Sequence, residues 1–365
     1  MALDGAFLSC LREELTSTLI EARIDKIHQP SREELVLDLR CRGCSKKLYI
    51  SARANSPRVH FTEISLENPA SPPMFCMLLR KRLTGGRLTA IRQLGLERAL
   101  YFDFDCVNEL GDIVRLTLAA EIMGRHSNII LIDSDLKIID SIKRIDFEAS
   151  SIRPVLPGLE YSPPPAAAGG MDLSLCSPEQ VIDAMLKGKE QPLSKALLAI
   201  SHGLSPLICR EVSHLATHGR DTDIRSLTQE ERHRAVFYLG RIKGAVETGD
   251  SRMPYILYDH KNIPLEFSFM PITQYGLSAV GHQTESFSSL LDEFYEKKDA
   301  ALRAKQRSHD MLRVLTNASE RITRKIENQQ RELKQSGDRD RLRIYGDLIH
   351  ANIGAIQKGA KSAAL

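Results

Sequence analysis

The sequence predicts an α+β protein, in which a mixed domain of helices and strands precedes an all-helical part and a coiled-coil helical hairpin. Three observations support this fold class. Short runs with strand periodicity fill much of the first 150 residues, helical periodicity dominates residues 177–246, and an uninterrupted helical pattern begins near residue 286. Because domains average about 150 residues, a chain of 365 residues is expected to hold about two to three of them.

The composition is that of a folded protein from a reducing compartment. Hydrophobic residues make up 42% of the chain and charged residues 27%, which is typical of a globular protein. No apolar run reaches the roughly 18 residues that a membrane-spanning helix needs. Residues 1–19 lack the basic start and the apolar core of a signal peptide. The cysteines number seven, an odd count that argues against a disulfide framework. We therefore expect a cytoplasmic protein.

The first domain begins with a helix and continues mainly in strands. Asp4 precedes an apolar ladder with helical spacing over residues 7–19, and its side chain can cap that helix. A second helix is expected over residues 71–82, and alternating apolar and polar residues over 88–142 indicate an antiparallel meander. Residues 154–170 are rich in Pro, Ala and Gly, which is typical of an extended linker.

An all-α region is expected next. Its first helix starts at Ser177-Pro178, where a capping residue is followed by proline. Gly203 separates two further helical stretches, and this arrangement indicates a helix-hairpin-helix. Such a hairpin can offer backbone N–H groups to phosphate, although plain helix packing explains the pattern equally well. Strand character returns over residues 253–269.

These patterns divide the chain into four expected regions. The third, a β segment, is expected to rejoin the first domain, and the fourth is expected to form a coiled coil. The regions are a first domain with its linker over residues 1–170, a helix-hairpin-helix domain over 171–250, the β segment over 251–285 and the coiled-coil region over 286–365.

The last region has the heptad spacing of a coiled coil. The apolar residues at its a and d positions are Leu312, Leu315, Ile322, Ile326 and Leu333. We expect Gly337-Asp338 to end this helix and a second helix to begin near Arg339. The simplest geometry is an antiparallel helical hairpin whose return arm is truncated, so that the chain is expected to be the N-terminal portion of a longer protein.

Positive charge is concentrated in the same region. Residues 297–334 contain 11 basic and five acidic residues, an excess of six, whereas the whole chain has a formal net charge of +3. A basic rod suits the phosphate backbone of a large nucleic-acid particle. The alternative is a charged coiled-coil exterior that faces only solvent.

One cysteine pair has the spacing of half a zinc site. Cys41-Arg-Gly-Cys44 could supply two zinc ligands and His60 a third, but no second C-x-x-C motif follows. A turn between two strands explains Arg42-Gly43 equally well. We therefore expect no metal.

The segment Glu121-Ile-Met-Gly-Arg-His-Ser-Asn-Ile-Ile130 joins a carboxylate, Arg, His, Ser and Asn in a turn between two strands. Gly124 provides a bend, and the polar side chains could contact phosphate, ribose or base edges. The alternative is a turn held by hydrogen bonds of Ser127 and Asn128. Because no nucleophile, metal-ligand set or phosphate loop accompanies the segment, catalysis is not expected.

The same segment resembles the signature of the NFACT family of RqcH- and NEMF-like ribosome quality-control factors, also known as fibronectin-binding protein A-like. The resemblance spans essentially the whole chain. Four other stretches agree with it, namely Met1-Ala-Leu-Asp-Gly5, Gly95-Leu-Glu-Arg98, Gly203-Leu-Ser-Pro206 and Arg343-Ile-Tyr-Gly-Asp-Leu-Ile-His-Ala-Asn352. It implies an NFACT-N domain, similar in fold to the N-terminal domain of formamidopyrimidine-DNA glycosylase, then the helix-hairpin-helix domain and the coiled coil.

In the family, an Asp-Arg pair and a Glu-Ile-Met triplet are tied to tRNA binding. The triplet matches here as Glu121, Ile122 and Met123, and the pair appears as Glu97-Arg98. Glu97 keeps the charge of the family's Asp but is longer by one methylene group. The full candidate tRNA-binding set is Glu97, Arg98, Glu121, Ile122, Met123, Arg125, His126 and Asn128.

The resemblance also implies a function. Proteins of this kind bind large ribosomal subunits blocked by peptidyl-tRNA and recruit tRNA, chiefly alanyl-tRNA in bacteria. They support a template-free C-terminal tail on the stalled product. They act as binding factors rather than enzymes and need no cofactor. Two alternatives are a surface adhesin for fibronectin and a glycosylase-fold protein that binds nucleic acid. The start Met1-Ala2-Leu3 lacks the Pro and Glu that those glycosylases use.

Overall fold

The computed structural model describes residues 3–148, 150, 152–165, 169–362 and 364, with the side chains of 297–307 and 309–310 left out. Parts of three sequence features therefore lie outside the described residues. They are residues 1–2 of the first motif, 166–168 of the linker and five basic side chains of the last region. The chain divides into two compact units, Met1–Glu296 and Lys297–Leu365.

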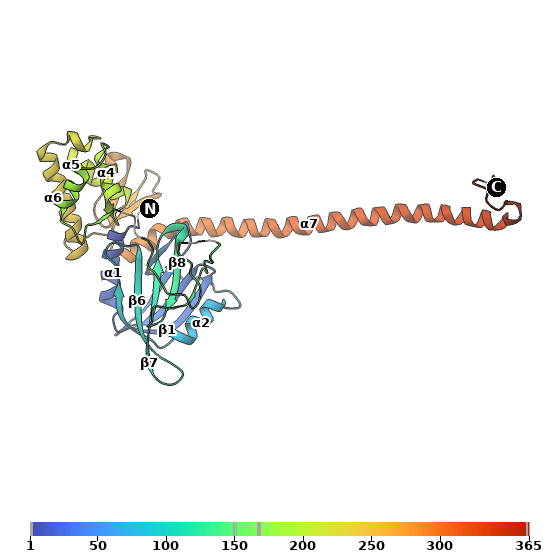
Figure 1. Ribbon diagram of the computed structural model, residues 1–365, viewed down its shortest axis with the longest axis horizontal. Helices are drawn as coiled ribbons and strands as arrows, with labels where there is room; N and C mark the ends of the chain where they lie inside the picture. The colour runs from blue at the N-terminus through green and yellow to red at the C-terminus, as the bar shows by residue number, and fades with distance from the viewer. Residues whose placement is uncertain (1–2, 149, 151, 166–168, 363, 365) are drawn as a thin grey trace. The chain divides into compact units, whose positions relative to one another are not determined.

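The first unit is built on a nine-stranded antiparallel sheet, which confirms the predicted α+β class. The strand order is β4-β3-β2-β1-β5-β6-β7-β8-β9, and helices α1 and α2 lie beside the sheet (Figure 1). In chain order the elements are α1 (Gly5–Leu19), β1 (Arg23–Ser31), β2 (Glu34–Arg40), β3 (Ser45–Ser51), β4 (Arg58–Phe61), α2 (Met74–Leu83), β5 (Arg87–Arg92), β6 (Ala99–Val107), β7 (Ile113–Glu121), β8 (Asn128–Ile132) and β9 (Ile138–Ser141).

Strand alternation gives this sheet a buried surface on both faces. On β6, Leu100 and Phe102 join the large core that contains α1 and α2, whereas Tyr101 belongs to a smaller core on the opposite face. Val155 and Tyr161, from the segment after β9, help to cover that second face. The first part of the segment predicted as a linker, residues 154–170, therefore packs against the sheet.

The helical region and a small separate sheet follow within the same unit. A parallel pair, β10 with β11, brackets the first two helices, and a three-stranded sheet has the order β13-β12-β14. The elements are β10 (Met171–Asp172), α3 (Pro178–Leu186), α4 (Leu193–Ile200), β11 (Ser201–His202), α5 (Pro206–Thr217), α6 (Gln229–Glu247), β12 (Tyr255–Tyr258), β13 (Pro264–Ser268) and β14 (Val280–Gln283), with short 3-10 turns at Ile224–Ser226 and Gly276–Ser278.

The segment 251–285 does not extend the nine-stranded sheet. It returns to the first domain through side chains instead, because the Phe267 ring meets Phe7 of α1 at a centroid distance of 5.0 Å. Phe287 packs against the Phe7 ring as well, at 5.3 Å. The core around α1 thus combines residues from both ends of the first unit.

The last helix, α7 (Phe287–Ala351), runs for 65 residues. The predicted end at Gly337 is wrong, because the helix continues through it and the described residues contain no returning arm. Glycine in a helix interior costs about 1 kcal/mol relative to alanine. The helix continues in spite of that cost, and Gly337 does not adopt the positive φ of a helix-ending glycine. A 3-10 turn, Ile353–Ala355, follows α7.

The predicted a and d residues of the coiled coil lie on α7 and are exposed. The side chain of Leu312, for example, is 60% exposed and that of Leu333 is 76% exposed. The coiled-coil pairing predicted from these positions is therefore not formed among the described residues and stays a prediction. None of the described helices has a stretch long and apolar enough to cross a membrane.

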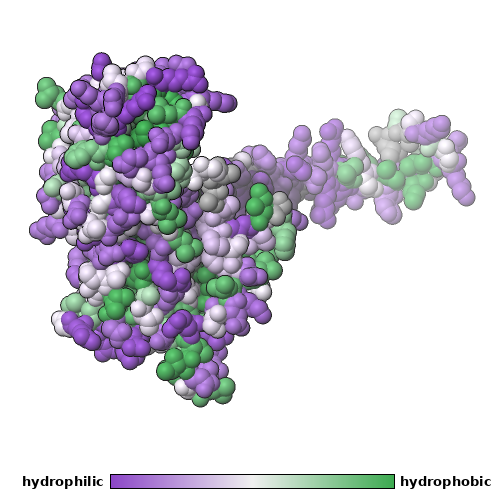
Figure 2. All heavy atoms as spheres, turned by 60° about the vertical axis from the view of Figure 1, so that its left-hand side comes forward, coloured by the Kyte–Doolittle hydropathy of each residue, from purple (hydrophilic) through white to green (hydrophobic). Residues whose placement is uncertain are grey.

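On the face drawn in Figure 2, polar and apolar side chains are mixed over the surface of the first unit. An apolar cluster lies at the tip of the hairpin between β6 and β7. Val107, Leu110 and Ile113 are all mostly exposed there.

Candidate functional site

Four of the family-like motif segments meet at one place in the first unit. The N–H of Ala6 donates to the carbonyl of Gly203 at 3.2 Å, and the N–H of Ile122 donates to the carbonyl of Arg98 at 2.8 Å. Gly5 is needed for this approach, since a Cβ at this position would lie 1.7 Å from the carbonyl oxygen of Leu96. Motifs that are up to about 200 residues apart in sequence are thereby brought together.

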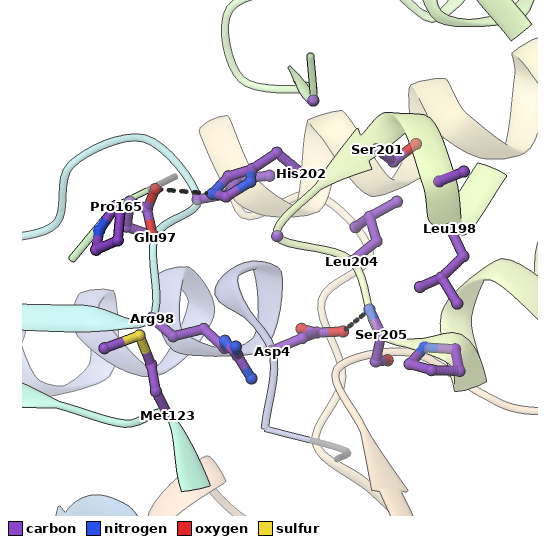
Figure 3. A pocket seen from close by; sticks show the side chains of 15 residues that line it. Asp4, Glu97, Arg98, Met123, Pro165, Leu198, Ser201, His202, Leu204 and Ser205 are labelled. Atoms are coloured by element: carbon purple, nitrogen blue, oxygen red, sulfur yellow. Dashed lines mark hydrogen bonds and ion pairs between the residues drawn. The ribbon is translucent and has the colours of Figure 1, made fainter. Parts of the chain in front are cut away.

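A cavity of about 450 Å³ lies where these segments meet (Figure 3). Its wall is partly apolar and partly polar. The polar side chains come from three different motifs and from the hairpin between α4 and α5. The lining residues that bear on function are Asp4, Leu96, Glu97, Arg98, Met123, His202, Leu204 and Ser205.

Asp4 joins two helices at the floor of this cavity. Its Oδ1 accepts the N–H of Phe7 at 2.8 Å and so caps α1, as the sequence predicts. Its Oδ2 accepts the N–H of Ser205, the capping residue of α5, at 2.8 Å. Burial raises the pKa of Asp4, although these hydrogen bonds and the nearby Arg98 oppose the rise. The backbone N–H of Ser205 is therefore used inside the protein and is not offered to a phosphate.

Glu97 and His202 contact each other in the lining of the cavity. Glu97 Oε1 lies 2.9 Å from His202 Nε2, and each side chain is 20% exposed. The backbone of Glu97 is held as well, because Gln93 donates to its carbonyl at 2.8 Å. The Arg98 side chain extends into the same space, beside Asp4 and Met123 (Figure 3). A carboxylate, a guanidinium and an imidazole thus face one small volume.

Glu121 lies close to the cavity but is fully buried. Its Oε2 accepts from Arg153 Nη1 at 3.0 Å, and its Oε1 accepts from the Tyr161 hydroxyl at 2.9 Å. Burial, followed by the charge of Glu121, raises the pKa of Tyr161, so that this hydroxyl remains a donor. With both oxygens occupied, Glu121 holds the end of β7 in place rather than facing a ligand.

The turn after Glu121 separates buried residues from exposed ones. Ile122 and Asn128 are buried, and the Asn128 side chain exchanges hydrogen bonds with the backbone of Lys143 at 2.8 and 3.1 Å. Arg125 and His126 are exposed on a 3-10 turn, Gly124–His126, and Arg125 Nε donates to His126 Nε2 at 3.0 Å. The turn therefore exposes the side chains of Arg125 and His126 and buries the side-chain amide of Asn128.

The eight predicted residues fall into three groups. Glu97, Arg98 and Met123 line the cavity, and Arg125 and His126 are exposed. The other three are buried, namely Glu121, Ile122 and Asn128. Sequence reasoning did not select two further lining residues, Asp4 and His202. Both could have been noticed, because Asp4 belongs to a family-like motif and His202 directly precedes another.

No three His, Cys, Asp or Glu side chains come together as a metal site among the described residues. The cavity is thus a place for hydrogen bonding, charge pairing and apolar contact, and its lining contains no cluster suited to hold a metal.

Comparisons with known proteins identify the family of the chain. The family model "NFACT N-terminal and middle domains" matches residues 4–365. The chain is 33% identical to the Rqc2 homolog RqcH of Bacillus subtilis over 369 residues, which covers 100% of this chain and 61% of that protein. It is 24% identical to the ribosome quality control complex subunit NEMF of Mus musculus over 367 residues, covering 96% of this chain and 33% of NEMF.

A solved structure shows the same fold. It is the N-terminal part of the fibronectin/fibrinogen-binding protein of Streptococcus suis, with 31% identity and a TM-score of 0.66, and the match covers 80% of this chain and 99% of that one. The chain spans about three fifths of the length of the Bacillus relative. Since the family model covers nearly every residue and its motifs meet at one cavity, the chain belongs to the NFACT family.

Proposed function

We propose that this chain is part of a ribosome-associated quality-control factor that recruits tRNA through the cavity of its first unit. One observation carries the proposal: Asp4, the Glu97-Arg98 pair and Met123 come from separate motifs but line one cavity. The names of the relatives, Rqc2 homolog RqcH and NEMF, support the ribosomal role.

The cavity has the chemistry to hold a base from a single-stranded tRNA loop. Proteins read such loops by splaying a base out, packing its faces and hydrogen-bonding its edge. Met123 and Leu198, which line the cavity and are not buried, offer apolar surface for the faces. Arg98 can donate to a carbonyl or a phosphate, while Glu97 can accept from a ring N–H or an amino group. Arg125, on the exposed turn, can contact the neighbouring phosphates.

The wider role follows the family. We propose that the factor acts in the cytoplasm on large ribosomal subunits that carry peptidyl-tRNA. There it recruits alanyl-tRNA for template-free extension of the stalled chain. It contributes no catalytic group of its own, because the ribosome forms the peptide bond. The basic helix α7 supplies positive charge for ribosomal RNA.

Binding of tRNA by three variants tests the cavity directly. Arg98→Ala is expected to weaken tRNA binding by about 1–3 kcal/mol, the range for removal of one direct contact. Arg98→Lys retains the charge but loses the forked geometry, and should show part of that effect. Arg241→Ala removes an exposed arginine of α6 outside the cavity and is the matched control. Dissociation constants measured at two salt concentrations provide the readout, with circular dichroism to verify folding.

If all three variants bind tRNA equally well, the cavity is not the tRNA site. A similar loss of tRNA affinity in Arg98→Ala and Arg241→Ala would indicate that tRNA is attracted nonspecifically by the total positive charge.

Binding of fibronectin or fibrinogen is the competing function, because the name of the Streptococcus suis protein includes both ligands. Saturable fibronectin binding that is unaffected by salt, together with absent tRNA binding, would favour it. We expect tRNA binding and no saturable binding of fibronectin.

A further inference from the structure

Two cysteines occupy the turn that joins β2 to β3. Arg40 and Ser45 are the last paired residues of the two strands, and Cys41 and Cys44 are the first and last residues of the turn between them. The N–H of Cys41 donates to the carbonyl of Cys44 at 2.9 Å. Gly43 adopts a φ of +80°, which lets the chain reverse within two residues. The tRNA-binding cavity does not involve this turn.

The geometry of the turn suits a disulfide. In a hydrogen-bonded antiparallel pair the two Cα atoms lie about 5.5 Å apart, and disulfides most often join Cα atoms about 5.5–6 Å apart. Cys41 and Cys44 thus face each other across a two-residue turn, at a Cα separation that a disulfide can span.

The other cysteines are placed differently. Cys10, Cys76, Cys106 and Cys209 are buried, and Cys176 is partly buried. Burial raises the pKa of Cys10 to about 12 and that of Cys106 to about 11, which keeps both thiols protonated and unreactive near neutral pH. Cys44, by contrast, is exposed.

The surroundings of Cys44 also indicate the kind of reactant. Arg42 and Lys47 are exposed beside it, and Lys46 is partly exposed. Cys44 is exposed whereas Cys41 is partly buried, so that Cys44 is the thiol expected to react first. Burial, followed by the neighbouring Cys44 thiol, also raises the pKa of Cys41. A small disulfide that carries carboxylates would be attracted to this cationic turn.

We propose that Cys41 and Cys44 form a redox-active dithiol that exchanges with small anionic disulfides and closes to an intramolecular disulfide. With glutathione disulfide as the oxidant, the Cys44 thiolate attacks one sulfur and releases one glutathione thiolate, leaving a mixed disulfide. Cys41 then gives its proton to solvent, and its thiolate attacks the Cys44 sulfur and releases the second glutathione. The two cysteines lose two electrons and two protons, and the oxidant is reduced to two thiols.

The test is mass spectrometry of the intact chain after exposure to glutathione disulfide. The parent should lose the mass of two hydrogen atoms and retain no glutathione, and peptide mapping should find the bond between Cys41 and Cys44. Cys41→Ser should retain one glutathione on Cys44, because the resolving thiol is missing. Cys44→Ser should react several times more slowly. Cys176→Ser, which removes a partly buried cysteine elsewhere, should behave as the parent.

A stable glutathione adduct on Cys44 of the parent would show that Cys41 cannot resolve it and would overturn the proposal. A bond to any other cysteine, or no reaction of the folded parent, would overturn it as well. The mass measurement does not depend on tRNA binding, so that it stands apart from the proposed function.

Discussion

The carboxylate of Glu121 is fully buried, and its negative charge is balanced by the guanidinium of Arg153, whose side chain is only 14% exposed. The two residues are 32 positions apart in the sequence, and Arg153 directly precedes the predicted linker, residues 154–170. Residue patterns along β7 predict its strand correctly. They do not identify the buried partner, because burial of a single carboxylate depends on how a distant segment covers the sheet.

Replacing Glu121 by alanine should lower stability rather than remove a ligand contact. The change leaves the Arg153 guanidinium buried without its carboxylate, and breaking such a pair from one side typically costs about 3–5 kcal/mol. Urea unfolding of Glu121→Ala and of Glu121→Ala with Arg153→Ala measures this, and the double variant should recover part of the loss. A Glu121→Ala protein with the parent's stability but weaker tRNA binding would instead make Glu121 a contact residue.

His202 is the residue that places Glu97. Because the contact of 2.9 Å between Glu97 Oε1 and His202 Nε2 fixes one carboxylate oxygen, the other is held in a defined position in the cavity lining. His202→Ala should therefore weaken tRNA binding by a few-fold, about 0.5–1 kcal/mol, while His202→Gln, which can still donate, should retain most of it. The comparison of the two dissociation constants is the measurement. Equal losses would mean that His202 contributes charge or bulk rather than a directed hydrogen bond.

At the scale of elements, the first turns of α7 are fastened to the rest of the first unit. Glu14 of α1 accepts the N–H groups of Phe287 and Ser288 at 2.7 and 3.1 Å, and so caps the helix start. One turn later, Asp292 receives hydrogen bonds from His60 at 2.7 Å and from Thr62 at 2.8 Å. The start of α7 is thus part of the folded core.

Asp292 gives this contact a pH dependence. Burial alone would raise its pKa, but the hydrogen bond and charge of His60, with the hydrogen bonds from Thr62 and Glu63, hold the pKa below its ordinary value of 3.8. A carboxyl whose pKa is lowered on folding stabilises the protein above its ordinary pKa. That contribution is lost as the pH falls through the lowered value.

We therefore expect Asp292→Asn to lower the free energy of unfolding at pH 7 by about 1.5–3 kcal/mol, the range for hydrogen bonds to a charged group. The difference from the parent should shrink as the pH falls below about 4. Urea unfolding across this pH range provides the measurement. Glu296→Gln, on an exposed carboxylate of the same helix, is the control. A difference that stays constant with pH would contradict the assignment.

Elements with strong local signals were predicted well. Asp4 and Ser177 mark helix starts that the structure confirms, because capping depends on residues within the same turn. The helix end predicted at Gly337 was wrong, because a glycine ends a helix only where the chain changes direction. The three-stranded sheet of β12, β13 and β14 could not be distinguished from an added edge of the first sheet, because strand pairing across such distances leaves no local pattern.

At the scale of the whole molecule, positive charge and the cavity belong to different compact units. Arg321→Glu with Lys325→Glu should weaken binding to large ribosomal subunits and make its salt dependence shallower, by about one unit of slope for each phosphate that is no longer neutralised. Binding of free tRNA should be unchanged. Arg321→Lys with Lys325→Arg retains both charges and is the matched control. A parallel loss of tRNA binding would mean that the two ligands share one surface.

The packing of Phe7 against Phe267 and Phe287 has a consequence for synthesis of the chain. Much of the first helix can pack against the sheet as soon as β5 and β6 have been made, but the two rings that meet Phe7 are made more than 250 residues after it. At about 5–20 residues per second, the Phe7 end of the helix waits roughly 15–60 s for these partners. This end of the core is therefore expected to stay uncovered, or to be covered by a chaperone, during translation of the chain. A ribosome that stops before Phe267 would hold an unfinished core.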